Sequence, residues 1–174
     1  CVVSCLLSVT DDTKLLCKML LAPLAEELES ICVHKYASLP ILHILAPSCN
    51  RYFTEHDRFS VEIGERDGEP TSKKPQELRR KELLKFLMPK LVASISKTLQ
   101  EKDELDNEEG LFNSKSGCNI LFETVTNEGG ESLFENLLDI VDEEFQLLDS
   151  FNTSRMYKRI VVETTSKSPK KQIE

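Results

Sequence analysis

The chain has 174 residues, the size of one domain or of a piece of a larger repeat array. Hydrophobic residues make up 40% and charged residues 30%, with 6 Gly and 7 Pro, which excludes collagen-like, glycine-linker and wholly disordered chains. The net charge of −8 argues against a chain that attracts nucleic acid over its whole surface, and no apolar run reaches the roughly 18 residues of a membrane span. An aromatic content of 6% with no Trp favours a soluble, mostly helical protein.

The N-terminal part of the sequence predicts short helices separated by polar or proline-containing breaks. In one of them Leu15, Leu16, Met19 and Leu20 belong to a common apolar face. Residues 10–12 (Thr-Asp-Asp) supply an N-cap for this helix. Residues 22–23 (Ala-Pro) interrupt the helix at its end. The predicted helices cover residues 2–9, 13–21, 24–33 and 39–45.

Two segments break the helical pattern in the rest of the chain. From residue 48 to 74, glycine, proline and charged residues replace the periodic apolar pattern, which predicts an irregular insertion. Residues 101–109 are mainly acidic and predict a linker. Pro89 is expected to kink or end a helix, and residues 163–174 are expected to form a disordered tail. Helices are predicted over residues 76–86, 89–99, 116–125, 132–148 and 154–162.

Comparison of the chain with itself indicates repeats. The first nine residues align with those that begin at Ala37, an offset of 36 residues, and four apolar positions coincide. A second pair of segments, which begin at Gly117 and Ser154, is separated by 37 residues. Units of this length, each with three short helices, stack into an α-solenoid. We therefore expect an all-α solenoid fragment with loop insertions.

The sequence offers no metal centre, cofactor site or catalytic motif. No Cys-x-x-Cys pair occurs among the six cysteines, and the three histidines lack zinc-finger spacing. A glycine-rich phosphate loop, a nucleophile elbow and paired catalytic carboxylates are also missing. We therefore expect no metal, no cofactor, no small-molecule substrate and no enzymatic activity. Cysteines in apolar helical segments, where a thiol packs as a small hydrophobe, indicate a reducing compartment such as the cytosol or nucleus.

Two groups of motifs stand out along the chain. Residues 8–15 (Ser-Val-Thr-Asp-Asp-Thr-Lys-Leu), 35–38 (Lys-Tyr-Ala-Ser) and 41–47 (Ile-Leu-His-Ile-Leu-Ala-Pro) resemble the last repeats of the Puf (Pumilio-repeat) family, in its Penguin/Puf-A-like branch. Residues 77–84 (Glu-Leu-Arg-Arg-Lys-Glu-Leu-Leu) and 115–121 (Lys-Ser-Gly-Cys-Asn-Ile-Leu) resemble the start of the CPL region that characterises this branch.

The resemblance implies a division into Pumilio-type three-helix repeats and a CPL region. Residues 1–47 would hold the end of one Pumilio-type repeat and part of the next. Residues 75–162 would hold CPL-like helical repeats around the acidic linker. The chain would then be a fragment of a longer solenoid, and its start at Cys1, within an apolar run, agrees with that expectation.

For function, the resemblance implies a protein that binds RNA, with DNA as an additional partner. In sequence-specific Puf proteins, side chains on the second helix of each repeat read the base edges. The corresponding positions here include Val2, Leu39 and Leu42, whose side chains have no donor or acceptor, so we expect little sequence preference. The branch implies pre-rRNA processing and large-subunit assembly in the nucleolus of the nucleus, with pre-ribosomal RNA and proteins as partners and no membrane.

Clustered Lys and Arg residues are candidates for contacts to RNA phosphates, because phosphate binding releases counterions. Pairing along a helix, of Lys81 with Glu77 and of Lys85 with Glu82, is the simpler explanation for the cluster at residues 73–90. Met156 and Ile160 are expected to pack inward, so that the cations beside them can be changed without loss of the fold. Tyr36 and His43 are candidates for base stacking, although a packing role is commoner for such rings. The phosphate-contact candidates are Arg155, Lys158, Arg159, Lys73, Lys74, Arg79, Arg80 and Lys81.

The alternative hypothesis is a protein-interaction scaffold of the HEAT or armadillo kind, without direct contact to nucleic acid. This hypothesis accounts better for the net charge of −8. A continuous basic surface would favour nucleic acid, whereas an apolar or acidic groove would favour a protein partner.

Overall fold

The computed structural model describes residues 2–47, 49–53, 73–101, 107, 109–143 and 148–167. All regular secondary structure within these residues is helical, which confirms the all-α fold class. None of the helices described here combines the length and the apolar character that crossing a bilayer demands. The elements are α1 (Val2–Val9), α2 (Thr13–Leu16), η1 (Cys17–Leu21), α3 (Ala22–Glu26), α4 (Leu28–Val33), α5 (Leu39–Leu45), α7 (Gln76–Gln100), α9 (Lys115–Thr126), α10 (Glu131–Glu143) and α11 (Phe151–Lys167).

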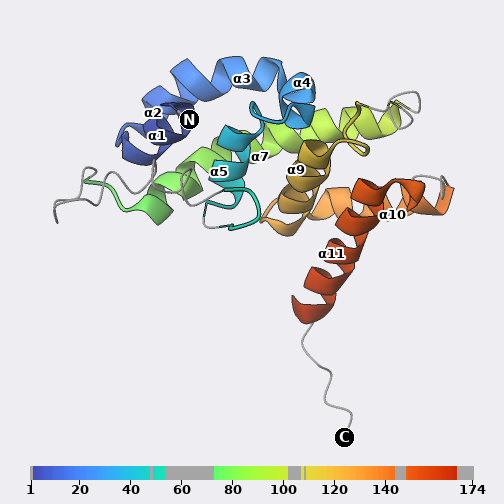
Figure 1. Ribbon diagram of the computed structural model, residues 1–174. Coiled ribbons are helices and arrows are strands. Elements are labelled where there is room, and N and C mark those ends of the chain that lie inside the picture. Colours follow the sequence, from blue (N-terminus) through green and yellow to red (C-terminus); the bar gives the residue numbers. More distant parts are fainter. Residues whose placement is uncertain are drawn as a thin grey trace, which may run out of the picture.

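The N-terminal helices form an arch that Figure 1 shows above the rest of the chain, with α2, η1 and α3 following one another without a break. The element η1 is a π-helical turn, in which the Ala22 N–H donates to the carbonyl of Cys17, five residues earlier. A proline ring crowds the preceding turn of a regular helix, and the wider turn comes directly before Pro23. The interruption predicted at residues 22–23 is therefore a change of helix type within one continuous segment.

The π-turn changes which apolar residues of this segment face the core. Leu16 and Leu21, five residues apart, are buried, whereas Leu15 and Met19 are 53% and 67% exposed. Of the predicted apolar face, Leu16 and the partly buried Leu20 pack in the core, whereas Leu15 and Met19 do not. The reason is that a five-residue turn shifts the phase of a 3.6-residue pattern.

The helix α7 is 25 residues long and runs beneath the arch in Figure 1. It continues through Pro89, where the sequence predicted a kink or an end. A proline inside a helix costs about 3 kcal/mol. Leu87, Met88 and Leu91 around it are all buried, and each such burial contributes about 1.5–3 kcal/mol, which outweighs the cost.

The helix α9 lies at the centre of the fold and contacts α4, α5, α7, α10 and α11. It begins at its N-cap residue Ser114, whose hydroxyl accepts from the Gly117 N–H at 2.9 Å. A Cβ atom at Gly117 would lie 2.2 Å from the carbonyl oxygen of Leu111, so this glycine lets the preceding turn pack closely on the helix. The carbonyl of Phe112 in that turn accepts from Thr153 of α11 at 2.7 Å, which ties α11 to the start of α9.

Parts of the predicted insertion, linker and tail lie outside the described residues. These parts are residues 48, 54–72, 102–106, 108 and 168–174. At the C-terminus the helix α11 continues past the predicted end at Val162 to Lys167, so the first residues of the predicted tail are helical. The division into three-helix repeats stays a prediction.

Candidate nucleic-acid interface

A basic pocket lies where the first turns of α9 and α11 meet, beside residues 49–53. Its volume is about 160 Å³. Four of the residues that line it are cationic and two are asparagines, and none of the described residues along its wall is acidic. We call it the α9–α11 pocket; its polar lining residues are Arg51, Lys115, Asn119, Asn152, Arg155 and Arg159.

Arg159 is held in the pocket by several neighbours at once. Its Nη1 donates to Asn119 Oδ1 at 3.2 Å, and its Nη2 donates to the Tyr52 hydroxyl at 2.8 Å. The same Nη2 forms an ion pair with Glu123 at 3.5 Å. The guanidinium carbon also lies 3.7 Å from the ring centroid of Phe122, a cation–π distance. These contacts fix the orientation of Arg159 before any ligand binds.

The carboxylate of Glu123 is the buried counter-charge of this network. Glu123 is 8% exposed, and it also accepts a hydrogen bond from the Tyr52 hydroxyl. Burial, more than these contacts, raises the pKa of Tyr52, so that its hydroxyl keeps its proton. The Glu123 carboxylate therefore largely balances the charge of Arg159. A ligand in the pocket would meet the positive charge of the other three cations.

Those three cations, Arg51, Lys115 and Arg155, are exposed and form no ion pair with any described residue. Asn152 is oriented by a hydrogen bond from its Nδ2 to the Asn113 carbonyl at 2.8 Å. Arg and Lys side chains converging on a cavity of this size are a suitable site for the charge-assisted hydrogen bonds that a phosphate group accepts. The pocket is therefore our candidate nucleic-acid interface.

The structure brings together two of the predicted phosphate contacts, Arg155 and Arg159. Lys158 is exposed on the same helix but does not line the pocket. Sequence reasoning missed Arg51 and Lys115, although both join the predicted pair in the pocket. Lys115 is the first residue of the motif 115–121 and directly precedes the helix predicted from residue 116, so it could have been found there. Arg51 lies in a segment without periodicity and carried no signal.

The predicted cluster at the start of α7 lies apart from this pocket. Lys74 forms an ion pair with Glu82, which also accepts a hydrogen bond from Thr13. Lys73 and Lys81 are exposed. The partner of Glu82 is therefore Lys74 and not Lys85, with which the sequence paired it. Lys73 and Lys81 stay predicted contacts.

Arg80 has a structural position that the sequence did not indicate. Its Nε donates to the Ile44 carbonyl at 2.8 Å, and its Nη2 donates to the Leu45 carbonyl and to Asn127 Oδ1, the latter at 3.1 Å. It therefore joins the C-terminal ends of α5 and α9 to α7. This guanidinium is committed to the protein, so Arg80 is corrected from a phosphate contact to a structural residue.

Arg80→Ala is expected to lower the free energy of unfolding by about 2 kcal/mol, because carbonyls at the end of α5 lose a charged donor. The measurement is a urea denaturation curve with an unchanged slope. Lys81→Ala, at the neighbouring exposed position, is the matched control and should change stability by less than about 0.5 kcal/mol. Equal stability of the two variants would contradict the structural role of Arg80.

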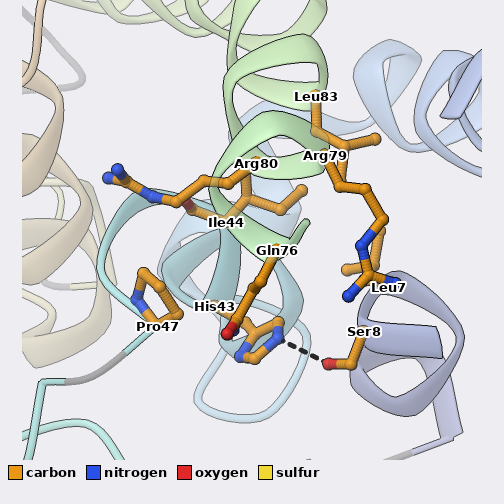
Figure 2. Close-up of a pocket in the computed structure, with 9 residues that line it drawn as sticks. All are labelled: Leu7, Ser8, His43, Ile44, Pro47, Gln76, Arg79, Arg80 and Leu83. Atoms are coloured by element: carbon orange, nitrogen blue, oxygen red, sulfur yellow. Dashed lines mark hydrogen bonds between the residues drawn. The ribbon is translucent and has the colours of Figure 1, made fainter. Parts of the chain in front are cut away.

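Arg79 is also buried, at 6% exposure, and so is not the surface contact that the sequence predicted. It lines a cavity of about 20 Å³ between α1, α5 and α7, and Figure 2 shows it directed toward Leu7 and Ser8 of α1.

The two candidate stacking rings, Tyr36 and His43, differ in exposure. Tyr36 is 64% exposed and carries the Lys35 ammonium 5.0 Å from its ring centroid, so it stays a candidate. His43 is 6% exposed, accepts or donates a hydrogen bond at 2.9 Å with Ser8, and packs edge-on against Phe53 at 5.8 Å. A base cannot reach its ring, and His43 is corrected to a core residue.

Metal coordination finds no support in the described part of the chain, where no three His, Cys, Asp or Glu residues are grouped as ligands. Burial raises the pKa of Cys32 and of Cys118 to about 12, so both thiols keep their protons.

Comparison with known proteins connects these features to a family. The family profile described as the CPL (NUC119) domain matches residues 33–172. Human Pumilio homolog 3 is 33% identical over 92 residues, which are 52% of this chain and 14% of that protein. Pumilio homolog 24 of Arabidopsis thaliana is 31% identical over 62 residues, which are 36% of this chain and 10% of that protein. The chain thus spans a small share of the length of these relatives, and no solved structure matches it. Because the profile covers most of the sequence, the chain belongs to the CPL (NUC119) domain family and is a relative of the Pumilio homologues.

Proposed function

We propose that this chain is an RNA-binding helical domain that holds phosphates of the RNA backbone in the α9–α11 pocket, with little preference for base sequence. The observation that carries the proposal is the convergence of Arg51, Lys115 and Arg155, all exposed, around the fixed guanidinium of Arg159. The relationship to Pumilio homologues supports a nucleic-acid ligand over other phosphate compounds. The proposed role is binding and requires no catalytic step.

The net charge of −8 is compatible with this proposal because charge acts locally. Exposed charges separated by more than about 8 Å are largely screened at physiological ionic strength. Acidic residues farther than this from the cavity therefore do not cancel the three cations around it. The lining of the cavity also suits a phosphate better than a base. Arg and Lys dominate its polar residues, and no aromatic ring is among its lining residues.

Little sequence preference is expected because several base-reading positions, Val2 and Leu42 among them, have apolar side chains. Val2 has no polar side-chain atom, and Leu42 in α5 is 3% exposed. RNAs of unrelated sequence should therefore bind within about tenfold of each other, far from the discrimination of direct base readout. Single-stranded DNA should bind as well, because phosphate contacts do not involve the 2′-hydroxyl.

The experiment is a fluorescence-anisotropy titration of the 174-residue chain with three unrelated single-stranded RNAs, from about 50 to 200 mM salt. Lys115→Gln and Arg155→Gln should each weaken binding to every RNA and reduce the salt slope by about one. Lys18→Gln, which removes an exposed cation from η1, is the matched control and should leave both quantities unchanged. Equal effects of all three substitutions would remove the α9–α11 pocket from the interface.

We further propose that the parent protein acts in the nucleolus, in pre-rRNA processing and large-subunit assembly, with pre-ribosomal RNA and proteins as partners. The support is the resemblance of the chain to the Penguin/Puf-A-like branch. Depletion of the protein should then cause large-subunit pre-rRNA intermediates to accumulate. Rescue by the wild type but not by Lys115→Gln/Arg155→Gln would connect this role to the pocket.

The scaffold hypothesis remains the second candidate because one face of α1 is apolar and exposed. Val2, Leu6 and Val9 recur at helical spacing and are 76%, 44% and 37% exposed. Such a face suits contact with another helical surface. If the RNA titration shows no saturable binding at about 50 mM salt, a protein partner becomes the better explanation.

A further inference from the structure

An exposed phenylalanine stands at the start of α11, beside the α9–α11 pocket. Phe151 is the first residue of this helix and is 76% exposed, more than Tyr36 at 64%. It is not part of the hydrophobic core, and no ring or cation of the described residues stacks on it. The next residue, Asn152, lines the pocket. A large apolar ring is therefore open to solvent next to the site proposed for phosphates.

The geometry of a helix places Phe151 and Arg155 on the same side of α11. Side chains four residues apart have Cβ atoms about 5–6 Å from each other. Arg155 lines the pocket and is exposed, and Lys158, three residues further along, is exposed as well. One side of α11 thus presents an aromatic ring followed by two cations.

This side of α11 is accessible to a long ligand. The helix packs chiefly against α9, and Figure 1 shows it extending away from the other helices. A flexible strand can therefore lie along α11 while one of its groups enters the pocket at the first turn of the helix.

A single strand of RNA carries both kinds of group that this side of the helix accepts. Its phosphates are held by cations, and its bases have flat faces that stack on aromatic side chains. The lining of the pocket contains no aromatic ring, so the base of a nucleotide whose phosphate is held there lies outside. One ribose joins that base to its phosphate, a reach comparable with the single helical turn that separates Arg155 from Phe151.

We propose that Phe151 is a base-stacking residue, on whose ring a base of the RNA lies while Arg155 and its neighbours hold the adjoining phosphate. This inference rests on the proposed function and adds a contact that the pocket itself does not make. Every base has a π-face, so stacking on Phe151 increases affinity with little preference for sequence. Single-stranded RNA should bind more tightly than a duplex, because the bases of a duplex are already stacked on each other.

The first measurement compares the affinity of the wild type and of Phe151→Ala for single-stranded RNA by fluorescence anisotropy. Loss of one stacked base should weaken binding about 5- to 150-fold. The salt slope should stay that of the wild type, because the ring carries no charge, whereas Arg155→Gln reduces it. Met19→Ala, which truncates an apolar side chain that is 67% exposed in η1, is the matched control and should bind as the wild type does.

The second measurement separates the bases from the backbone. An oligonucleotide of the same length with an abasic ribose at every position keeps the phosphates and removes the stacking partners. The wild type and Phe151→Ala should bind it equally, and Arg155→Gln should bind it more weakly than both.

The third measurement observes the contact directly. The chain contains no tryptophan, so Phe151→Trp introduces a single indole. This variant should bind RNA at least as tightly as the wild type, because an indole stacks on bases as a phenyl ring does. Its fluorescence should be quenched to saturation by single-stranded RNA and should not change with the abasic oligonucleotide. The midpoints of urea unfolding of both Phe151 variants should match the wild type, because the position is exposed.

Three results would overturn the proposal. The first is an unchanged RNA affinity of Phe151→Ala while Lys115→Gln and Arg155→Gln still weaken binding. The phosphate pocket would then stand, and the ring would be left as an apolar contact for a protein partner. The second is an equal loss of affinity for RNA and for the abasic oligonucleotide in Phe151→Ala, which would assign to the ring a structural effect on the pocket. The third is a wild type that binds no RNA, which would remove the proposed function and the stacking contact together.

Discussion

Replacing Arg159 with alanine is expected to lower the free energy of unfolding by about 3 kcal/mol, measured by urea denaturation. The substitution leaves the Glu123 carboxylate, which is 8% exposed, without the guanidinium that lies 3.5 Å away. Tyr52 loses the hydrogen bond that Arg159 donates to its hydroxyl. An uncompensated buried charge costs several times what an exposed ion pair contributes.

Arg155→Ala, one turn earlier on α11, is the control and should change stability by less than about 0.5 kcal/mol, because this side chain is exposed. A double-mutant cycle with Glu123→Gln and Arg159→Gln should give a coupling energy of at least about 1 kcal/mol. Stability of Arg159→Ala equal to that of Arg155→Ala would contradict the network. The expectation that all cations of this helix can be changed without loss of the fold thus does not extend to Arg159.

Acidification from pH 6.5 to about 4 is expected to remove about 3 kcal/mol of stability through His43 alone. Burial lowers the pKa of His43 from 6.5 to about 4. Between these values the unfolded chain binds a proton at this imidazole and the folded protein does not. The contribution is therefore complete above pH 6.5 and decreases as the pH falls toward 4.

The measurement compares urea denaturation of the wild type and His43→Gln at neutral pH and at about pH 4.5. Carboxylates titrate in the same range in both proteins, so their contribution cancels in the difference. His43→Gln should lose less stability on acidification than the wild type, whereas His34→Gln, at an exposed position, should follow the wild type. Parallel losses in all three proteins would show that His43 is not the buried neutral group described above.

The amino-acid sequence by itself determined the helical class and most of the helices. The start of α9 could be predicted because its signals are local, namely a serine N-cap and apolar residues at helical spacing. Met156 was correctly expected to pack inward beside Arg155 and Lys158, because the period of a helix separates the two faces without reference to any partner. The positions of the helices, and the side of each helix that is buried, thus follow from residues within a few positions of each other.

Only the tertiary structure decided which cations are available to a ligand. Arg79, Arg80 and Lys81 are adjacent in the sequence, yet the first lines a cavity, the second holds two helix ends and the third is exposed. The pocket unites Arg51 with Lys115, which are far apart along the chain. These outcomes depend on neighbours contributed by distant helices, and no local pattern encodes burial against them. The same holds for Pro89, because the long-range packing of α7 outweighs a local tendency of the chain to break the helix.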